Sequence, residues 1–392
     1  MSELSYLEKL LDGVEVEWLS LGELGDFIRG NGLQKKDFVE SGFPAIHYGQ
    51  IYTRYGLSAD KTFTYVLPEL ANKLRKAQKN DLLLATTSEN DEDVVKPLAW
   101  LGDNVAISGD MMLFRHEQNV KYLAYFFQSE IFQTQKMKYI TGAKVRRVSS
   151  GDLSKIKIPI PSSNNPEKSL TIQSEIVRIL DKFTALTAEL TAELAMRKKQ
   201  YNYYRDQLLS FDEGEVEWKT LGEITTKIAS GRNKTRDADG KFPVYGSTGL
   251  IGFIDKAAYS GDLLLVARVG AYAGLVNAVS GHFDVSDNTL IIHPSDSWNV
   301  RFAFHQLRHM NLNQYAVGAG QPLITGGLLK NLKVPFPSLK EQTRIAKILD
   351  KFETITASIS EGLPREIELR QKQYEYYRDL LFSFPKPDAV SN

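Results

Sequence analysis

Side chains suited to contacting nucleic acid gather in two groups of loop segments. Arg, Lys, Asn and Gln carry paired donors and acceptors that match base edges, while Ser, Thr and Tyr commonly contact phosphates. The first group comprises His47, Tyr48, Gln50, Tyr52, Arg54, Thr86, Thr87, Ser88, Lys144, Arg146 and Arg147. The second group comprises Arg232, Asn233, Lys234, Arg236, Tyr245, Ser247, Thr248, Arg268, Tyr272 and Gln321. At any single position an ordinary solvated side chain is the commoner interpretation, so this pattern needs support from the rest of the chain.

Sequence signatures of catalysis are missing. There is no phosphate-binding loop ending in Gly-Lys-Ser/Thr, no His-Glu-x-x-His and no Gly-x-Ser-x-Gly. His305 and His309 are spaced to share one helix face, as metal ligands can be, but no acidic residue adjoins them and a structural role is favoured. We therefore expect no catalytic residue, no metal site and no cofactor bound by this chain.

Composition narrows the class of protein. The 48 basic and 48 acidic residues give a formal net charge of zero, which argues against a protein that coats a polyanion but permits local basic patches. There is no cysteine, and the segment 1–12 lacks the basic start and apolar core of a signal peptide. No apolar run approaches the roughly 20 residues that span a bilayer. These features predict a cytoplasmic protein of two or three domains with no membrane partner.

Four blocks of sequence recur in the same order, so the chain is an internal duplication. The first block is Glu15-Val16-Glu17-Trp18 with Leu21-Gly22-Glu23, matched by Glu215-Val216-Glu217-Trp218 with Leu221-Gly222-Glu223. The second is Gly142-Ala143, Leu153, Lys157, Pro159, Pro161 and Ser162, matched by Gly318-Ala319, Leu329, Lys333, Pro335, Pro337 and Ser338. The third is Gln173 with 179–183, matched by Gln342 with 348–352, and the fourth is 197–206, matched by 370–379.

Between these blocks, residues 25–141 and 225–317 share only a faint outline. Short β-rich runs occur at 81–86, 105–115, 262–268 and 288–293, and helices are expected at 122–138 and 301–313. Each copy is therefore expected to be a mixed α/β domain. Similar frames around different contents suggest one scaffold that presents two specificities.

Each domain is followed by a predicted long amphipathic helix. Residues 170–210 and 345–381 carry apolar side chains at alternating steps of three and four, which is a heptad seam. A helix of about 40 residues would extend about 60 Å. The two helices could each pack on their own domain, but a seam this long favours antiparallel packing on each other. Gly362-Leu363-Pro364 indicates a break and restart in the second helix.

The repeated blocks resemble the specificity subunit of type I restriction-modification enzymes, particularly the type IC group. The resemblance lies in 214–218, 179–183, the tandem Thr-Ala-Glu-Leu of 187–194, 197–209 and 361–384. It implies two target recognition domains of mixed α/β fold, separated by two long antiparallel coiled-coil helices with pseudo-twofold symmetry. The implied segments are an N-terminal segment 1–14, a first recognition domain 15–162, a central helix 163–212, a second recognition domain 213–338, a C-terminal helix 339–384 and a tail 385–392.

The resemblance also implies a function and partners. Each recognition domain would read one half of a split double-stranded DNA target, and the helices would set the spacer between the halves. The helices would also dock two modification (methyltransferase) subunits, through which restriction (motor and nuclease) subunits join. The helix residues expected to serve this docking are Ile179, Phe183, Tyr201, Tyr204, Ile348, Phe352, Tyr374 and Tyr377. Adenine methylation and cleavage, with S-adenosylmethionine, ATP and magnesium, would belong to the partners.

Two competing functions are open at this point. An autonomous nuclease or methyltransferase would need an acidic metal cluster or a cofactor loop. A coiled-coil assembly scaffold without base readout would keep the helical seams but would need no divergent basic loops.

The two ends of the chain are expected to meet. Segment 6–12 is partly similar to segment 204–212, so the ends would complete a circular repeat.

Overall fold

The computed structural model describes residues 9–11, 13–212, 214–235, 237–318, 320–358 and 361–384. The chain forms two compact units. The first unit contains residues 1–189 with 368–392, and the second contains 190–367. Each unit therefore combines one globular domain with parts of the long helices.

The globular part of the first unit mixes short strands with short helices, as predicted. Its strands are β1 (Val16–Ser20), β2 (Gly25–Arg29), β3 (Phe43–Ile46), β4 (Ser58–Ala59), β5 (Thr64–Val66), β6 (Lys76–Ala77), β7 (Leu82–Ala85), β8 (Thr87–Ser88), β9 (Lys96–Trp100), β10 (Val105–Ile107), β11 (Met111–His116), β12 (Arg146–Arg147) and β13 (Lys157–Pro161). Its helices are α2 (Leu21–Leu24), α3 (Tyr48–Thr53), α4 (Pro68–Ala71), α5 (Val120–Gln128), α6 (Glu130–Lys136) and α7 (Ser150–Leu153). The main sheets have the orders β2-β11-β7-β9-β4 and β5-β3-β10-β6.

The second unit repeats this plan with fewer elements. Its strands are β14 (Glu217–Thr220), β15 (Thr225–Ser230), β16 (Phe242–Gly246), β17 (Gly249–Ile254), β18 (Tyr259–Ser260), β19 (Leu263–Ala267), β20 (Val276–Val279), β21 (His282–Val285), β22 (Thr289–Pro294) and β23 (Lys333–Phe336). Its short helices are α9 (Leu221–Ile224), α10 (Val300–His309) and α11 (Gly326–Asn331). Its sheets have the orders β15-β22-β19-β20 and β17-β16-β21-β18.

The duplication is visible in how the repeated blocks pair with each other. In the first unit β1 pairs antiparallel with β13, placing Trp18 opposite Pro159. In the second unit β14 pairs antiparallel with β23, placing Trp218 opposite Pro335. Two of the four matched blocks are thus the two strands of one small ribbon, and both units keep it.

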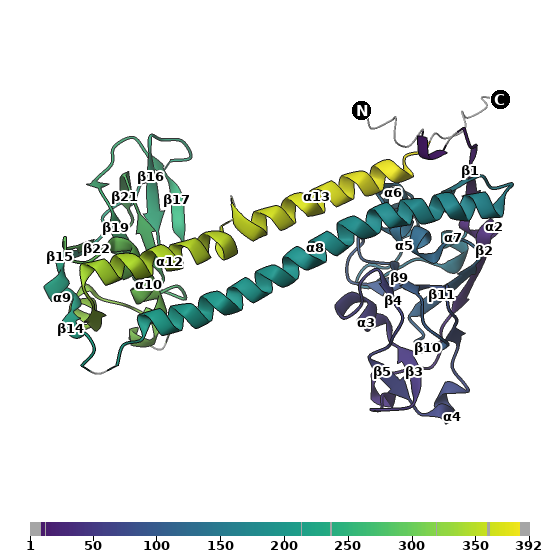
Figure 1. The fold of residues 1–392 in the computed structure, drawn as a ribbon, viewed down its shortest axis with the longest axis horizontal. Coiled ribbons are helices and arrows are strands. Elements are labelled where there is room, and N and C mark those ends of the chain that lie inside the picture. The colour runs from purple at the N-terminus through teal and green to yellow at the C-terminus, as the bar shows by residue number, and fades with distance from the viewer. Residues whose placement is uncertain are drawn as a thin grey trace. The chain divides into compact units, whose positions relative to one another are not determined.

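The long helices follow the prediction with one interruption. Helix α8 (Pro166–Leu209) is a single helix of 44 residues that contributes to both units. The second helix is divided into α12 (Leu339–Ala357) and α13 (Gly362–Phe382), so the break predicted at Gly362–Pro364 is confirmed (Figure 1). No helix in the described ranges is both long and apolar enough to cross a membrane.

Both predicted modes of helix packing occur, on different stretches of the seam. The first turns of α8 pack on their own domain, where Ile172, Ile176 and Leu180 lie in the core. Ile176, which is on the predicted seam, is fully buried. Leu180 and its repeat partner Leu349 are also fully buried, whereas the seam predicted their neighbours Ile179 and Ile348, which are half-buried. At this point α8 faces both its own domain and the other long helix. It therefore buries a second apolar stripe, one residue away from the predicted seam.

Further along, the helices pack on each other. In the first unit, Phe183 of α8 stacks on Tyr377 of α13 with ring centroids 5.3 Å apart. In the second unit, Tyr204 of α8 stacks on Phe352 of α12 at 5.7 Å. The residue numbers rise on one helix while they fall on the other, as antiparallel packing requires.

The end of the chain completes the core of the first domain. Phe382 is fully buried, with its ring 5.0 Å from that of Tyr122 and 5.6 Å from that of Phe126. Phe384 joins the same cluster, against which Leu10 packs near the chain start. In the second unit the equivalent position is Leu209, at the end of α8. The circular repeat is thus supported by the described residues, while residues 6–8 and 12 lie outside them.

Candidate nucleic-acid interface

In the second unit, four segments gather around the turn formed by residues 286–288, between β21 and β22. We call the turn, together with segments 231–235, 245–248, 268–272 and 320–323, the second turn edge. The carbonyl oxygen of Asn288 accepts hydrogen bonds from the Arg268 backbone N–H at 2.9 Å and from the Ser247 hydroxyl at 3.0 Å. The Ser286 backbone N–H donates to the Tyr245 carbonyl at 2.9 Å.

Segment 231–235, which follows β15, is hydrogen-bonded to the residue before this turn. The backbone N–H groups of Arg232 and Asn233 both donate to the Val285 carbonyl, at 3.1 and 3.0 Å. Gly231 is required there, because a Cβ atom on it would lie 2.2 Å from the Ser286 carbonyl oxygen. The Asn233 side chain is also used internally: its amide nitrogen donates to Asp284 at 2.6 Å, and its oxygen accepts from the Thr235 N–H. Asn233 therefore fixes the position of segment 231–235.

The remaining predicted residues of this unit lie around that frame. Arg232, Lys234, Thr248, Tyr272 and Gln321 are exposed, whereas Tyr245, Ser247 and Arg268 are half-buried. The loops that carry Tyr272 and Gln321 are joined by the Gly270 N–H, which donates to the Pro322 carbonyl at 2.9 Å. A hollow of about 550 Å³ opens beside the turn, lined by residues that include Lys234, Ser247 and Asn288. Arg236 lies outside the described residues.

The first unit has an equivalent arrangement of main-chain contacts around the turn at residues 108–110. We call this region the first turn edge. The carbonyl of Asp110 accepts from both the N–H and the hydroxyl of Thr86, each at 3.0 Å. Gly30 approaches the turn as Gly231 does, since its Cβ would lie 2.1 Å from the Ser108 carbonyl oxygen. Thr86 thus stands where Arg268 stands in the second unit, and Asp110 stands where Asn288 stands.

Several predicted residues of the first unit have internal partners. Burial lowers the pKa of His47, and its ring accepts from the Gly49 N–H at 3.3 Å to cap α3. The Gln50 side chain accepts from the His47 N–H at 2.9 Å. The Tyr52 hydroxyl lies 3.0 Å from the Thr87 carbonyl, and burial raises its pKa. These contacts give His47, Gln50 and Tyr52, together with the buried Thr86, a role in shaping the edge; direct DNA contact by them stays a prediction.

A second ribbon brings the basic residues of the first unit to the same edge. Strand β12 pairs with β8, so Arg146 lies opposite Ser88 and Arg147 opposite Thr87. Arg146 forms an ion pair with Asp91 at 2.7 Å, whereas Lys144 and Arg147 are exposed.

Two more predicted residues of this unit lie on or after α3. Tyr48 is half-buried at its start. The exposed Arg54, at its end, places its guanidinium 5.7 Å from the ring centre of the exposed Phe63.

Lys136, which no sequence pattern singled out, supports this edge from inside. Its side chain is fully buried, and the ammonium donates to the carbonyls of Glu92 at 2.9 Å and Val94 at 3.0 Å. Burial lowers the pKa of Lys136 to about 8 despite the acidic residues nearby. The acidic loop 89–93, which carries the partner of Arg146, is therefore held in a fixed position.

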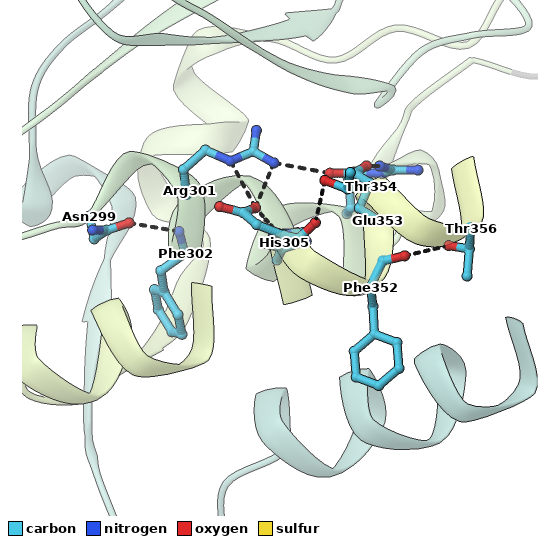
Figure 2. A network of polar contacts seen from close by, with 10 residues as sticks. Asn299, Arg301, Phe302, His305, Phe352, Glu353, Thr354 and Thr356 are labelled. Atoms are coloured by element: carbon cyan, nitrogen blue, oxygen red, sulfur yellow. Dashed lines mark hydrogen bonds and ion pairs between the residues drawn. The ribbon is translucent and has the colours of Figure 1, made fainter. Parts of the chain in front are cut away.

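The matched block around 179–183 and 348–352 joins each domain to its long helix. Gln342 accepts from the Asn299 N–H at 2.8 Å, as Gln173 accepts from that of Asn119 at 3.0 Å. Asp350 of α12 then accepts from Arg301 at 2.6 Å and contacts His305 at 2.7 Å, while Arg301 also reaches Glu353 (Figure 2). In the first unit, Asp181 likewise accepts from Lys121 and Tyr125.

The histidines considered as metal ligands have separate partners. His305 faces Asp350 and Glu353, a set that could in principle hold an ion, but Arg301 already bridges these two carboxylates. His309 instead lies 3.3 Å from Asp206. The positive charge of Arg301 offsets the negative charge of the two carboxylates, which favours the structural role predicted for the histidines.

Replacement of Asp350 by Asn should destabilise the second unit by about 1–3 kcal/mol, because Arg301 loses its charged acceptor at a half-buried site. Hydrogen bonds from Arg301 and His305 outweigh burial and keep the pKa of Asp350 low, and burial lowers that of His305. Both groups bind protons more readily when unfolded, so stability should fall as the pH drops below about 6.5 and again below about 4. The second decline should be smaller in Asp350→Asn.

Thermal unfolding followed from about pH 2 to about pH 8 measures both effects. Glu341→Gln on the same helix is the control, since its ion pair with Arg344 is exposed and should contribute little. Equal stability of the Asp350→Asn and Glu341→Gln variants would contradict the importance of the network.

Comparison with known proteins places the chain in one class. Residues 13–196 and 213–369 match the family described as the type I restriction modification DNA specificity domain. The chain is 41% identical over its full length, and over the full length of the relative, to the EcoR124I/EcoR124II specificity subunit of Escherichia coli. It is 39% identical to the EcoprrI specificity subunit of Escherichia coli, covering 92% of this chain and 93% of the relative.

A solved structure shares the fold. The type I restriction-modification S subunit from M. genitalium matches 96% of this chain and 98% of its own, with a TM-score of 0.62 at 16% identity. The chain belongs to the family of type I restriction-modification specificity subunits.

Proposed function

We propose that this chain selects the DNA target of a type I restriction-modification complex, with each turn edge reading one half of a bipartite sequence. The observation that carries this proposal is the pair of turn edges. Both are built by the same backbone hydrogen bonds, yet Thr86 and Asp110 in one stand where Arg268 and Asn288 stand in the other. A shared frame with different contact groups is what two independent readers of different sequences require.

The chain itself is a non-catalytic component under this proposal. Two modification subunits would dock on the long helices and methylate adenine with S-adenosylmethionine. Restriction subunits would join through them in the cytoplasm and use ATP and magnesium. Of the eight helix residues expected to serve docking, Phe183, Tyr377, Tyr204 and Phe352 stack in pairs within the chain, and Tyr201 also lies beside Phe352. Tyr374 is buried, with its hydroxyl 2.9 Å from Gln128. These side chains would therefore hold the helices in the arrangement on which the partners dock, and exposed neighbours such as Tyr203 and Tyr376 would make the direct contact.

Exchange of one variable region for that of another family member should change one half-site only. The exchanged segment should be 25–148 rather than 25–141, because Arg146 and Arg147 pair with Ser88 and Thr87 and belong to the first turn edge. Mapping of methylated sites in cells that carry the partner subunits gives the result. A change in both halves would contradict independent reading, and methylation that follows no sequence would instead support a scaffold without base readout.

A further inference from the structure

The turn at the centre of each edge holds its last residue by the main chain and leaves the side chain available. In the second unit, the hydrogen bonds from Arg268 and Ser247 both end on the carbonyl oxygen of Asn288. In the first unit, both bonds from Thr86 end on the carbonyl oxygen of Asp110. The position of the turn is therefore fixed without any use of these two side chains.

The two side chains are accessible and nearly unengaged. Asn288 is exposed, and within the described parts of the chain its amide makes no hydrogen bond. The Asp110 carboxylate is 41% exposed and lies 4.0 Å from Arg29, whose Nε donates to the Gly109 carbonyl instead. An exposed polar group on a rigid main chain can meet a ligand with little loss of conformational freedom.

The chemistry of the two groups differs in the way that base edges differ. A carboxamide offers a donor beside an acceptor, which matches N7 and the N6 amino group of adenine in the major groove. A carboxylate offers acceptors alone, which matches the N4 amino group of cytosine. Near Asn288, Arg268 and Lys234 supply positive charge where flanking phosphates would lie.

We propose that Asn288 and Asp110 are equivalent base-reading residues, Asn288 contacting an adenine in the second half-site and Asp110 the amino group of a cytosine in the first. This inference rests on the proposed function and names two residues that determine its specificity. Neither residue was singled out by the sequence pattern, because an Asn or Asp in a turn ordinarily serves the turn itself.

The test is to exchange the two groups, one at a time, in the assembled complex. Asn288→Asp should convert one position of the second half-site from adenine to cytosine and leave the first half-site unchanged. Asp110→Asn should convert one position of the first half-site from cytosine to adenine. Methylation of the original sites should fall about tenfold or more in each variant. Genome-wide mapping of methylated sites and binding of synthetic duplexes give both readouts.

Matched controls lie at the other end of the same strands. Asp296→Asn, after β22, and Glu117→Gln, after β11, replace a carboxylate by a carboxamide at exposed positions, as Asp110→Asn does and as Asn288→Asp does in reverse. Both should leave the two half-sites unchanged. Asn288→Ala should keep the melting temperature, because the main-chain bonds remain, and should lose discrimination at one position.

Three outcomes would overturn the inference: an unchanged second half-site in both Asn288 variants, a change in both halves, or the same change in a control. Failure of the proposed function looks different, because the unmodified chain would then direct methylation to no bipartite sequence at all.

Discussion

A third Thr-Ala-Glu-Leu unit inserted after Leu194 should lengthen the unread spacer by one or two base pairs and leave both half-sites unchanged. Four residues add about 6 Å to a helix, compared with about 3.4 Å for a base-pair step. Methylation at the original sites should fall by more than about 100-fold, because only one half of such a site can be engaged in register. Mapping of methylated sites in cells measures the spacer directly.

The structure explains why the insertion should be tolerated. From residue 185 to residue 200, no side chain of α8 belongs to a domain core or packs against one, so neither core depends on this stretch. Four residues also make about 1.1 turns, which nearly preserves the face of the helix. Substitution of Ala188 and Ala192 by Ser, at exposed positions of the same units, changes no length and is the control. An unchanged spacer in the insertion variant would refute the role of α8 as a ruler.

Replacement of Phe382 by Ala should destabilise the first unit by about 3–5 kcal/mol, the range typical of a buried aromatic side chain that leaves a cavity. The Phe382 ring is fully buried between those of Tyr122 and Phe126. The second unit has no share in this core, so its unfolding should be unaffected. Hydrogen exchange resolves the two units, with faster exchange expected in α5 and unchanged exchange in α10.

Leu369→Ala is the matched control for Phe382→Ala. Leu369 lies on the same helix, and 43% of its side chain is exposed, so its loss should alter stability by no more than about 0.5 kcal/mol. If Phe382→Ala behaved like this control, the C-terminal helix would not be part of the first domain.

The repeated blocks predicted the frame of the fold because they mark contacts that both halves need. Gln173 and Gln342 each accept from the N–H of the residue that caps the start of a domain helix, and Asp181 and Asp350 each bind side chains of that helix. Such contacts require particular residue types, so the same residues are found at equivalent positions in both halves of the sequence. The break before α13 was predictable for a similar reason, since Gly and Pro limit the backbone directly.

The turn edges were less predictable because their geometry depends on residues distant in the sequence. Tyr52 and Gln50 looked like surface groups, but Tyr52 is hydrogen-bonded to strand β7 and Gln50 to strand β5. Asn288 was overlooked because its exposure follows from main-chain bonds to Ser247 and Arg268, which no local pattern reveals. A list of polar loop residues therefore cannot separate residues that hold a loop from residues that face outward.

The division of the chain into units has a consequence for its synthesis. All residues of the second unit, 190–367, are contiguous, whereas the first unit needs residues 368–384 to close the core around Tyr122 and Phe126. A ribosome therefore releases every part of the second unit before the last helix of the first. The domain translated first must wait for the final residues, while the domain translated second can fold at once. During that interval the first domain exposes the apolar surface that Phe382 later covers, so the nascent chain is most vulnerable to aggregation and proteolysis at its beginning.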